Sequence, residues 1–376
     1  MRKPSPGTRK PAQAGLTPRP GILEIAPYVG GDSELPGIAK PIKLASNESA
    51  LGPSPRAVAA YRDCAAALHR YPDGSHLRLR EALAQRHRMD AANIVCGNGS
   101  DELLAMLAKA YAGPGDEVLY TAHGFLLYPI VALAAGATPV VAPESELRTD
   151  VDALLKRVTP RTRIVFLANP NNPTGSYIPK AELRRLRDGL PDDVLLVIDA
   201  AYAEFVTARD YSAGADLVAA FDNVVMTRTF SKIYALAALR LGWALCPPNV
   251  AGVLNRLRGP FNLNTAAQAA GIAALEDIAL ETQAREHNTR WRDWLAVELT
   301  RLGLHVYPSV TNFLLVRFGA DAKHGAAAAD KFLRGEGIIL RRVDNYGLPE
   351  CLRVTVGRDD EMRTLVSALG RFLGRS

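Results

Sequence analysis

Short apolar runs rich in β-branched residues recur along the middle of this chain and alternate with helix-like segments. Turn residues bound each run, which is the pattern of strands buried on both faces of a parallel sheet. The intervening segments, such as KAELRRLRDGL (residues 180–190), have helical periodicity. This alternation predicts a doubly wound, mainly parallel α/β domain. The runs are found at residues 93–97, 117–120, 138–143, 163–169, 193–199 and 223–230.

A different pattern begins near residue 266. A long helical region, 266–302, is followed by segments in the order strand, helix, strand, strand, helix. This order predicts a smaller α+β domain over residues 266–376. The proline-punctuated residues 21–57 are predicted to form an N-terminal arm and part of the small domain, and residues 58–265 the large domain.

The positive charge is concentrated at the start of the chain. The formal net charge is +6, and residues 1–20 carry five Lys or Arg and no acid, which leaves +1 for the remaining 356 of the 376 residues. Because they are also rich in Pro and Gly, residues 1–20 are predicted to be a disordered basic tail. The nearly neutral remainder gives no indication of nucleic-acid binding.

Several classes of protein are disfavoured by what the sequence lacks. The chain has no apolar run near the roughly 20 residues needed to span a bilayer, and its start does not resemble a secretory signal. Its four cysteines are widely separated without a CxxC pair, and its seven histidines have no metal-ligand spacing. We therefore expect no metal site, no membrane association and a cytoplasmic location.

Four polar motifs follow the ends of predicted strands. Ligands of open α/β sheets bind at the carboxyl ends of the strands, so these motifs predict one shared site. Each motif alone also has an ordinary structural explanation: a glycine turn with Ser100 as a helix cap, a proline-stiffened turn, or a helix cap by Asp199. The motifs are GNGSDE (97–102), NPNNPTG (169–175), DAAY (199–202) and TFSK (229–232).

Lys232 is the only lysine in the largely apolar stretch 227–245. Lysine is rarely buried without a partner, and near apolar or cationic groups a depressed pKa makes its amine a nucleophile toward carbonyls. Asp199 ends a buried strand, where a carboxylate must be paired, and a protonated pyridine nitrogen is a suitable partner. These two residues predict pyridoxal 5′-phosphate as the cofactor, with Lys232 as its Schiff-base lysine.

Seven motifs in this order resemble those of the fold-type I, class I/II aminotransferases, which depend on pyridoxal phosphate. The resemblance covers about residues 21–376 and is strongest to the histidinol-phosphate aminotransferase group. It implies the type I fold of these transferases, with a large seven-stranded-type sheet domain and a smaller α+β domain. The motifs are IKLASNESALGPSP (42–55), HRYPDGSHLRLREALA (69–84), GNGSDE, NPNNPTG, IDAAYAEF (198–205), TRTFSKIYALAALRLGW (227–243) and YGLPECLRVTVG (346–357).

The resemblance implies specific contacts to the cofactor ring. Lys232 would form the Schiff base and then carry the proton between substrate Cα and cofactor C4′, while Asp199 would keep the ring nitrogen protonated. Asn172 and Tyr202 would hydrogen-bond the ring oxygen, which makes Lys232, Asp199 and Tyr202 the expected catalytic residues. Phe125 would pack against the ring face, and a plain core phenylalanine is the alternative for that position.

The resemblance also implies a set of polar residues around the cofactor phosphate. Some of them would act through backbone N–H groups. Tyr71 would reach the phosphate held by the neighbouring subunit, so a homodimer is expected. The phosphate-end residues of the chain itself are Gly99, Ser100, Asp101, Thr229, Ser231 and Arg240.

Two arginines are expected to read the substrate. By the resemblance, Arg353 would bind the α-carboxylate, for which a planar fork is suited. Arg341 would bind the substrate phosphate, with Tyr28 contributed from the other subunit and Asn47 of the SNES motif also at the substrate. The adjacent Arg342 is a second candidate for binding this anion. The alternative interpretation of Arg341 is a surface arginine on an edge strand.

The implied activity is transfer of the amino group of histidinol phosphate to 2-oxoglutarate, giving imidazole-acetol phosphate and glutamate, a step of histidine biosynthesis. Two other activities remain open: an aromatic amino acid aminotransferase acting on phenylalanine or tyrosine, and a phosphothreonine-type decarboxylase. A non-enzymatic regulator with the same fold is disfavoured, because Lys232, Asp199, Asn172 and Tyr202 are all present.

Overall fold

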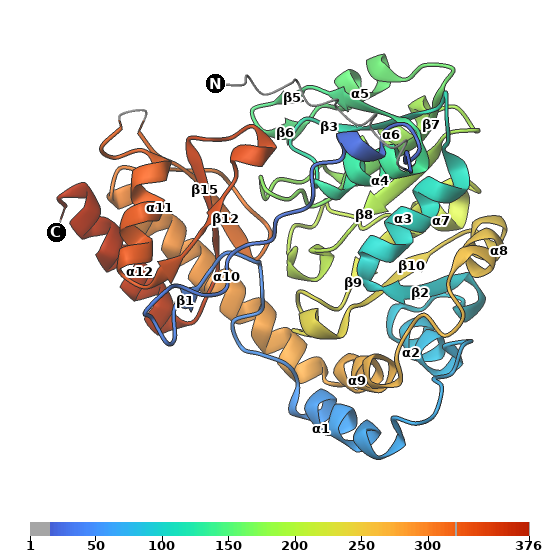
Figure 1. Ribbon diagram of the computed structural model, residues 1–376, viewed down its shortest axis with the longest axis horizontal. Coiled ribbons are helices and arrows are strands. Elements are labelled where there is room, and N and C mark those ends of the chain that lie inside the picture. The colour runs from blue at the N-terminus through green and yellow to red at the C-terminus, as the bar shows by residue number, and fades with distance from the viewer. Residues whose placement is uncertain (1–15, 320–321, 376) are drawn as a thin grey trace, which may run out of the picture.

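The computed structural model describes residues 16–319 and 322–375. A seven-stranded sheet in the order β2-β10-β9-β8-β7-β3-β4 forms its larger part (Figure 1). All neighbours in this sheet are parallel except β10, which is antiparallel to both β2 and β9. The predicted mainly parallel α/β sheet is therefore confirmed. The strands are β2 (Ile94–Asn98), β3 (Glu117–Thr121), β4 (Thr138–Ala142), β7 (Thr162–Ala168), β8 (Leu195–Asp199), β9 (Val224–Thr229) and β10 (Leu241–Leu245).

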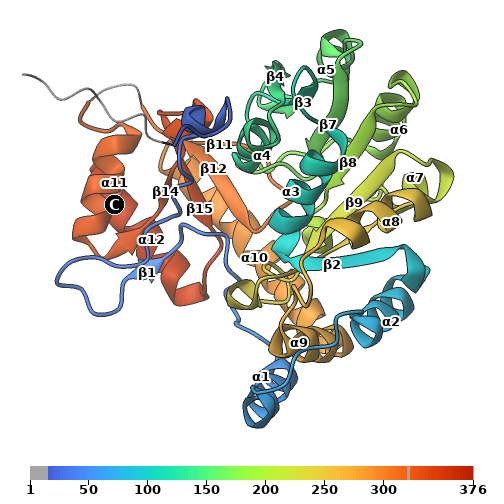
Figure 2. The same ribbon diagram turned by 45° about the vertical axis from the view of Figure 1, so that its right-hand side comes forward.

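Helices cover both faces of this sheet, and alternate residues of each strand pack against opposite layers. On β7, Ile164 and Phe166 pack with α3, α4 and α8, whereas Val165 and Leu167 pack with the helices of the other face. Figure 2 shows α3 and α4 on one side of β7–β9, and α6 and α7 on the other. The helices are α1 (Pro55–Asp63), α2 (Leu77–His87), α3 (Gly99–Tyr111), α4 (Leu127–Ala135), α5 (Val151–Arg157), α6 (Lys180–Gly189), α7 (Ala215–Ala220), α8 (Pro248–Leu257) and α9 (Thr265–Glu276).

Strand β10 was not separated from the surrounding lysine motif by sequence analysis. Its Gly242 lies against the start of α3, where an added Cβ would be 2.3 Å from the backbone nitrogen of Ser100. Only glycine permits this approach, because any side chain would collide with backbone. The strand thereby places the lysine motif directly beside the GNGSDE motif.

The C-terminal part forms a second, smaller sheet of four antiparallel strands in the order β11-β12-β15-β14. Its core is closed by α11, α12 and the last turns of α10 (Ile278–Arg301). The predicted order of strand, helix, strand, strand and helix is found, except that the first predicted strand is divided into β11 and β12 and the second into β13 and β14. The N-terminal arm adds β1 to β13 in parallel. The elements are β1 (Ile42–Lys43), β11 (His305–Val306), β12 (Phe313–Arg317), β13 (Ile338–Ile339), β14 (Arg341–Arg342), β15 (Cys351–Thr355), α11 (Ala326–Gly335) and α12 (Asp359–Leu373). A short hairpin, β5 (Glu144–Ser145) and β6 (Arg148–Thr149), follows β4.

The long helical region predicted at 266–302 consists of two helices, α9 and α10 (Ile278–Arg301). They are separated at Asp277, whose side chain accepts from the Leu280 N–H at 3.3 Å and caps α10. Helix α9 packs on α1 and α2 and shares the core of the large sheet. Helix α10 begins beside α2, where Arg86 pairs with Glu281 at 2.8 Å, and ends in the core of the small sheet (Figure 1).

The N-terminal arm connects the two sheets along the surface of the molecule (Figure 1). Most of the predicted basic tail, residues 1–15, lies outside the described residues, and Arg19 donates to the Ala134 carbonyl of α4 at 2.8 Å. Asp32, further along the arm, pairs with Arg334 of α11 at 2.6 Å. Over the part of the chain that the structure describes, none of the helices has the length and apolarity needed to cross a membrane.

Candidate active site

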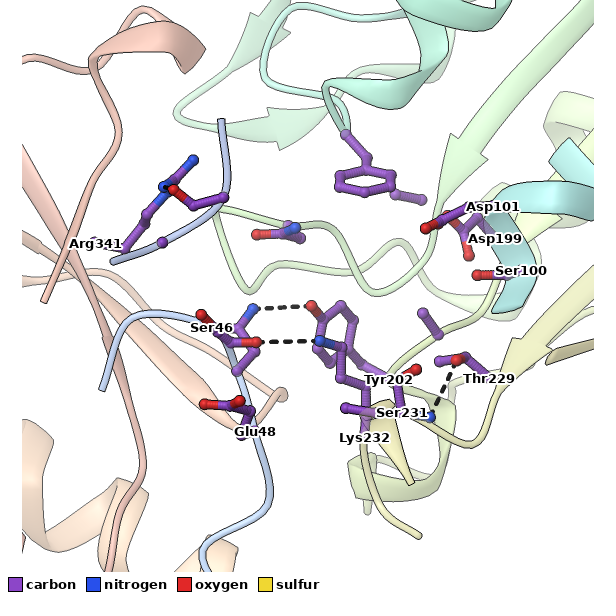
Figure 3. A pocket seen from close by; sticks show the side chains of 18 of the residues that line it. Ser46, Glu48, Ser100, Asp101, Asp199, Tyr202, Thr229, Ser231, Lys232 and Arg341 are labelled. Carbon is purple, nitrogen blue, oxygen red and sulfur yellow. Dashed lines mark hydrogen bonds between the residues drawn. The ribbon is translucent and has the colours of Figure 1, made fainter. Parts of the chain in front are cut away.

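A cavity of about 330 Å³ lies at the carboxyl ends of β7, β8 and β9, and the small sheet and the arm close its other side. All predicted site residues except Gly99 and Tyr71 line it. Figure 3 shows Lys232 and Tyr202 in its middle, Asp101 and Asp199 at one side, and Arg341 at the opposite side. The predicted residues that line the cavity are Tyr28, Asn47, Ser100, Asp101, Phe125, Asn172, Asp199, Tyr202, Thr229, Ser231, Lys232, Arg240, Arg341 and Arg353.

Lys232 follows β9 and points into the cavity (Figure 3). Its ammonium group donates to the Ser46 carbonyl at 3.3 Å and lies 5.7 Å from the centre of the Tyr202 ring. Burial, together with the nearby Arg353 cation, lowers the pKa of Lys232 to about 8. An amine with this pKa is partly neutral near physiological pH, which suits attack on an aldehyde.

Asp199 is buried at the end of β8. Its carboxylate accepts from the Tyr128 hydroxyl at 3.1 Å and from the Thr227 hydroxyl at 3.3 Å. Burial raises the pKa of Asp199 to about 6. A cation bound in the cavity beside it would favour its charged form and offset this cost.

Tyr202 and Asn172 line the cavity from two different loops. The Tyr202 hydroxyl accepts from the Asn47 amide at 2.8 Å, so its own proton remains available for a ligand. The Asn172 carbonyl oxygen accepts from Arg353, which leaves the Asn172 amide nitrogen as a donor. Each side chain therefore has a donor available to a ligand in the cavity.

Arg353 is a buried guanidinium on β15. One of its terminal nitrogens donates to Asn172 and the other donates to the Ala45 carbonyl at 2.7 Å. Within the described residues its Nε atom has no hydrogen-bond partner. Burial lowers the pKa of Arg353, and no carboxylate of the described residues forms an ion pair with it, so this cation is suited to an anionic ligand.

The predicted phosphate-end residues are brought together by the start of α3 and the loop after β9. Helix α3 begins without a side-chain cap; the Gly99 N–H donates to the Arg240 carbonyl at 2.9 Å, and the N–H groups of the next residues can bind an anion. Arg240 spans the region, because it pairs with Asp101 at 3.1 Å and donates to the Ser231 hydroxyl at 3.3 Å. Gly99 does not line the cavity, but its missing side chain makes room for Arg240: an added Cβ would be 2.5 Å from that guanidinium.

Phe125 lines the cavity and packs edge-on against two tyrosines. Its ring centre is 6.0 Å from that of Tyr128 and 6.4 Å from that of Tyr28. The position is therefore a cavity wall rather than a plain core site, which is the arrangement expected of a residue that covers a ligand ring.

Arg341 and Arg342 are adjacent on β14 and point to opposite sides, as neighbours on a strand do. Arg341 lines the cavity, and its terminal nitrogens donate to the Gly30 and Val29 carbonyls at 2.6 and 2.7 Å. Arg342 instead pairs with Asp344, with 2.9 Å between Nε and Oδ2. Arg341 is thus the arginine available to the cavity.

Tyr28 lines the cavity of its own chain, and its predicted contribution to the cavity of a partner subunit stays a prediction. Arg341 donates to the carbonyls of the two residues that follow Tyr28 and keeps the arm at this cavity. Gly31 then packs closely on residues 45–46, where an added Cβ would be 3.0 Å from the Ala45 Cβ.

Tyr71 lies away from the cavity of its own chain, as expected of a residue that serves a neighbouring one. Its side chain is 83% exposed and stacks on Phe261 with ring centres 4.7 Å apart.

Sequence reasoning missed several residues that shape the site. Ser46 supplies the carbonyl that Lys232 contacts, and Glu48 lines the cavity beside it. Tyr128 and Thr227 contact Asp199 from outside the cavity. The SNES segment contains Ser46 and Glu48, and HGFLLY (123–128) contains Tyr128, but only the fold shows which neighbour each one reaches.

The cavity fits pyridoxal phosphate at each of its chemical groups. Lys232 is an amine with a lowered pKa for the aldehyde, and Asp199 is a buried carboxylate for the ring nitrogen. The uncapped start of α3 and the adjacent Arg240 can hold the phosphate. Over residues 16–319 and 322–375, no three His, Cys, Asp or Glu side chains are grouped so that they could hold a metal ion.

Comparison with known proteins gives a consistent result. The family model described as "Aminotransferase class I and II" matches residues 39–369. The histidinol-phosphate aminotransferase of Paramagnetospirillum magneticum is 60% identical over 357 residues, which cover 95% of this chain and 98% of that protein. That of Rhodospirillum centenum is 59% identical over 96% of this chain and 99% of its own length.

A solved structure has the same fold. The histidinol-phosphate aminotransferase from Sinorhizobium meliloti, crystallised in complex with pyridoxal-5′-phosphate, superimposes with a TM-score of 0.87 at 29% sequence identity. The superposition covers 96% of this chain and 99% of that chain.

Proposed function

The chain belongs to the class I and II aminotransferases, and from this premise we propose that it transfers the amino group of histidinol phosphate to 2-oxoglutarate. It is a pyridoxal-phosphate-dependent enzyme, and its products are then imidazole-acetol phosphate and glutamate in histidine biosynthesis. The observation that carries this proposal is the 60% identity, over 95% of the chain, to a protein with that activity.

The charges of the cavity agree with these substrates. Arg353 and Arg341 both line it, so two cations face the ligand in addition to those at the cofactor phosphate end. Glutamate and 2-oxoglutarate carry two carboxylates, and histidinol phosphate carries a phosphate, all of which arginine binds well. A phenylalanine substrate has one carboxylate and would leave Arg341 without a partner.

When bound, pyridoxal phosphate supplies an aldehyde for the amino group and an electron-withdrawing ring that acidifies the substrate Cα. Lys232 takes the proton from Cα, for which its lowered pKa is suited. Asp199 holds the proton on the ring nitrogen through its carboxylate. The Tyr202 hydroxyl and the Asn172 amide, which Asn47 and Arg353 hold in place, would donate to the ring oxygen and orient the ring relative to Lys232.

The substrate is oriented by the two arginines. Arg353 binds the α-carboxylate of glutamate or 2-oxoglutarate, and Arg341 binds the second anionic group, either the side-chain carboxylate or the phosphate of histidinol phosphate. Asn47 holds Tyr202 in place through its amide, at 2.8 Å, and Tyr28 closes the cavity beside Arg341. Phe125 covers the ring face.

A homodimer is also part of the proposal. Tyr71 and Phe261 form an exposed aromatic pair on one chain, with Tyr71 83% exposed. In a symmetric dimer Tyr71 would reach the phosphate in the partner cavity. Light scattering should give the mass of two chains, and Tyr71→Ala should weaken cofactor retention.

The remaining predictions concern location and division of the chain. We propose a cytoplasmic enzyme, because all four cysteines are free, as is usual in a reducing compartment. We retain the division into an arm (21–57), a large domain (58–265) and a small domain (266–376), although α9 and Ala284 of α10 pack within the large-sheet core.

A half-reaction screen tests the proposed substrate. Purified, cofactor-loaded protein is mixed with histidinol phosphate, glutamate, phenylalanine or phosphothreonine, and the cofactor absorbance is followed. Histidinol phosphate and glutamate should convert the cofactor to its amine form fastest. Faster conversion by phenylalanine would replace the proposal by an aromatic aminotransferase, and release of carbon dioxide from phosphothreonine would replace it by a decarboxylase.

A further inference from the structure

Tyr128 is a buried residue of α4 that does not line the cavity but contacts its central carboxylate. Its hydroxyl donates to Oδ2 of Asp199 at 3.1 Å. Thr227, on the neighbouring strand, donates to the other oxygen at a longer 3.3 Å. The carboxylate is therefore held from behind by two hydroxyl groups, while its remaining lone pairs stay available to the cavity.

The ring of Tyr128 has no room to turn away from this contact. It stacks on Phe166, with ring centres 4.9 Å apart and planes 8° from parallel. Phe125 and Tyr120 pack edge-on against it at 6.0 and 6.1 Å. An added Cβ at Gly124 would already be 3.3 Å from the ring. The donor is thus fixed by packing before any ligand binds.

The surroundings of Asp199 make the hydrogen bond from Tyr128 important for the charge state of the carboxyl group. Burial raises the pKa of Asp199, and the Asp101 carboxylate on α3 adds to that effect. Tyr128, Thr227 and the Ala201 N–H oppose it by donating to the charged form. Tyr128 itself keeps its proton, since burial and the adjacent carboxylate raise its pKa well above the usual value.

We propose that Tyr128 is a positioning residue that keeps Asp199 ionised and aimed into the cavity before the cofactor arrives. The proposal rests on the proposed function only in that a cationic ring nitrogen is the intended partner of Asp199. Tyr128 also packs against Phe125. One side chain therefore positions both Asp199, the proposed partner of the ring nitrogen, and Phe125, which is proposed to cover the ring face.

The experiment measures the carboxyl group of Asp199 directly. The full chain, freed of cofactor and labelled with carbon-13 at aspartate side-chain carboxyls, is titrated by NMR, and Asp199→Asn identifies the signal. The unaltered chain should titrate near pH 6. In Tyr128→Phe, which keeps the ring packing, the midpoint should rise by roughly one pH unit, because a hydrogen bond to the charged form is lost.

Two further samples make the test specific to the donated hydrogen bond. Tyr120→Phe removes another buried hydroxyl that has no contact with Asp199 and should leave the midpoint unchanged. Placing 3-fluorotyrosine at position 128 keeps the shape and strengthens the donor, so the midpoint should fall. If Tyr128→Phe does not fold, the shift of the Asp199 midpoint in the 3-fluorotyrosine sample still tests the proposal.

Cofactor binding supplies the second readout. The affinity for pyridoxal phosphate should weaken as pH falls through the Asp199 midpoint, and in Tyr128→Phe this loss should begin about one pH unit higher. Unchanged midpoints in both position-128 samples would overturn the proposal. Neither measurement uses a substrate, so failure of the histidinol-phosphate reaction alone would leave this inference standing.

Discussion

The two ends of the cavity are built in different ways. At the proposed cofactor end, Asp199 is the buried last residue of β8, and Lys232 follows β9 closely, both strands lying in the middle of the seven-stranded sheet. At the substrate end, Arg341 lies on a two-residue strand, and Tyr28 lies on an arm and is 53% exposed. The first end is fixed by the core, and the second is fixed by a few contacts between loops.

This difference separates the chemistry of the reaction from its selectivity. Groups that move protons must be held closely relative to one another, and strand ends in a packed sheet provide that. Groups that read the outer part of a substrate can lie on the arm and on the small sheet, where a substitution leaves the core intact. Loss of a residue at the cofactor end should therefore affect every substrate, and loss at the substrate end should affect some.

The largest effect is expected at Lys232. Lys232→Ala should abolish turnover with all substrates, because both the amine that attaches the cofactor and the proton carrier are lost. The chain should still fold, as shown by an unchanged circular dichroism spectrum. Borohydride reduction of the cofactor-loaded protein, followed by peptide mapping, should label Lys232, and a label on another lysine would contradict its assignment.

Asp199→Ala should come next, with proton abstraction slowed by several orders of magnitude for every donor, because the ring nitrogen is left largely unprotonated. Single-turnover absorbance measurements with glutamate provide the rate. Thr227→Val, which removes only the longer of the two hydroxyl contacts, is the matched control and should have a small effect. If Asp199→Ala kept activity near that of the unaltered enzyme, Asp199 would be a helix cap without a role in the reaction.

At the substrate end the effect should be selective. Arg341→Ala should lower kcat/KM for histidinol phosphate by roughly ten- to hundredfold, the cost of one charge-assisted contact, and much less for phenylalanine. Arg342→Ala is the control, since that side chain pairs with Asp344 outside the cavity. An equal loss on both substrates would mean that Arg341 acts mainly through the arm.

The smallest effect concerns pH. With a pKa of about 8, more of Lys232 becomes neutral as pH rises, so the cofactor-free protein should bind pyridoxal phosphate faster. The increase should be roughly fivefold from pH 7 to 8 and only about twofold from pH 8 to 10. Stopped-flow absorbance measures this rate. A tenfold rise per pH unit up to pH 10 would indicate a lysine of ordinary pKa.

The cofactor end was predictable from the sequence because its residues lie within short motifs at strand ends. The contacts of Tyr128 with Asp199 and of Ser46 with Lys232 were not, because they join segments that only the fold brings together. Local spacing also left Arg341 and Arg342 undecided: neighbours on a strand point to opposite faces, but the sequence does not say which face is the cavity.

The place of Tyr28 within its own chain was not predictable from the sequence for a related reason. Its position depends on how the arm crosses the surface, which the Arg341 contacts to two backbone carbonyls determine. Backbone carbonyls are present at every residue, so no side-chain pattern marks them as partners. Strand β10 was missed because its sequence continues the lysine motif without a turn.

Helix α10 connects the cores of the large and the small sheet, so a change in its angle would move one relative to the other. It has 24 residues, so it is roughly 36 Å long, and a tilt of about 5° at one end moves the other by roughly 3 Å. Its first turn is fastened at Asp277, which accepts from the Ser54 hydroxyl at 2.5 Å, while its last turns carry the sheet that holds Arg341 and Arg353. The distance across the cavity from the Lys232 amine to the Arg341 guanidinium therefore depends partly on the Asp277–Ser54 contact, which lies far from every group proposed to touch the substrate.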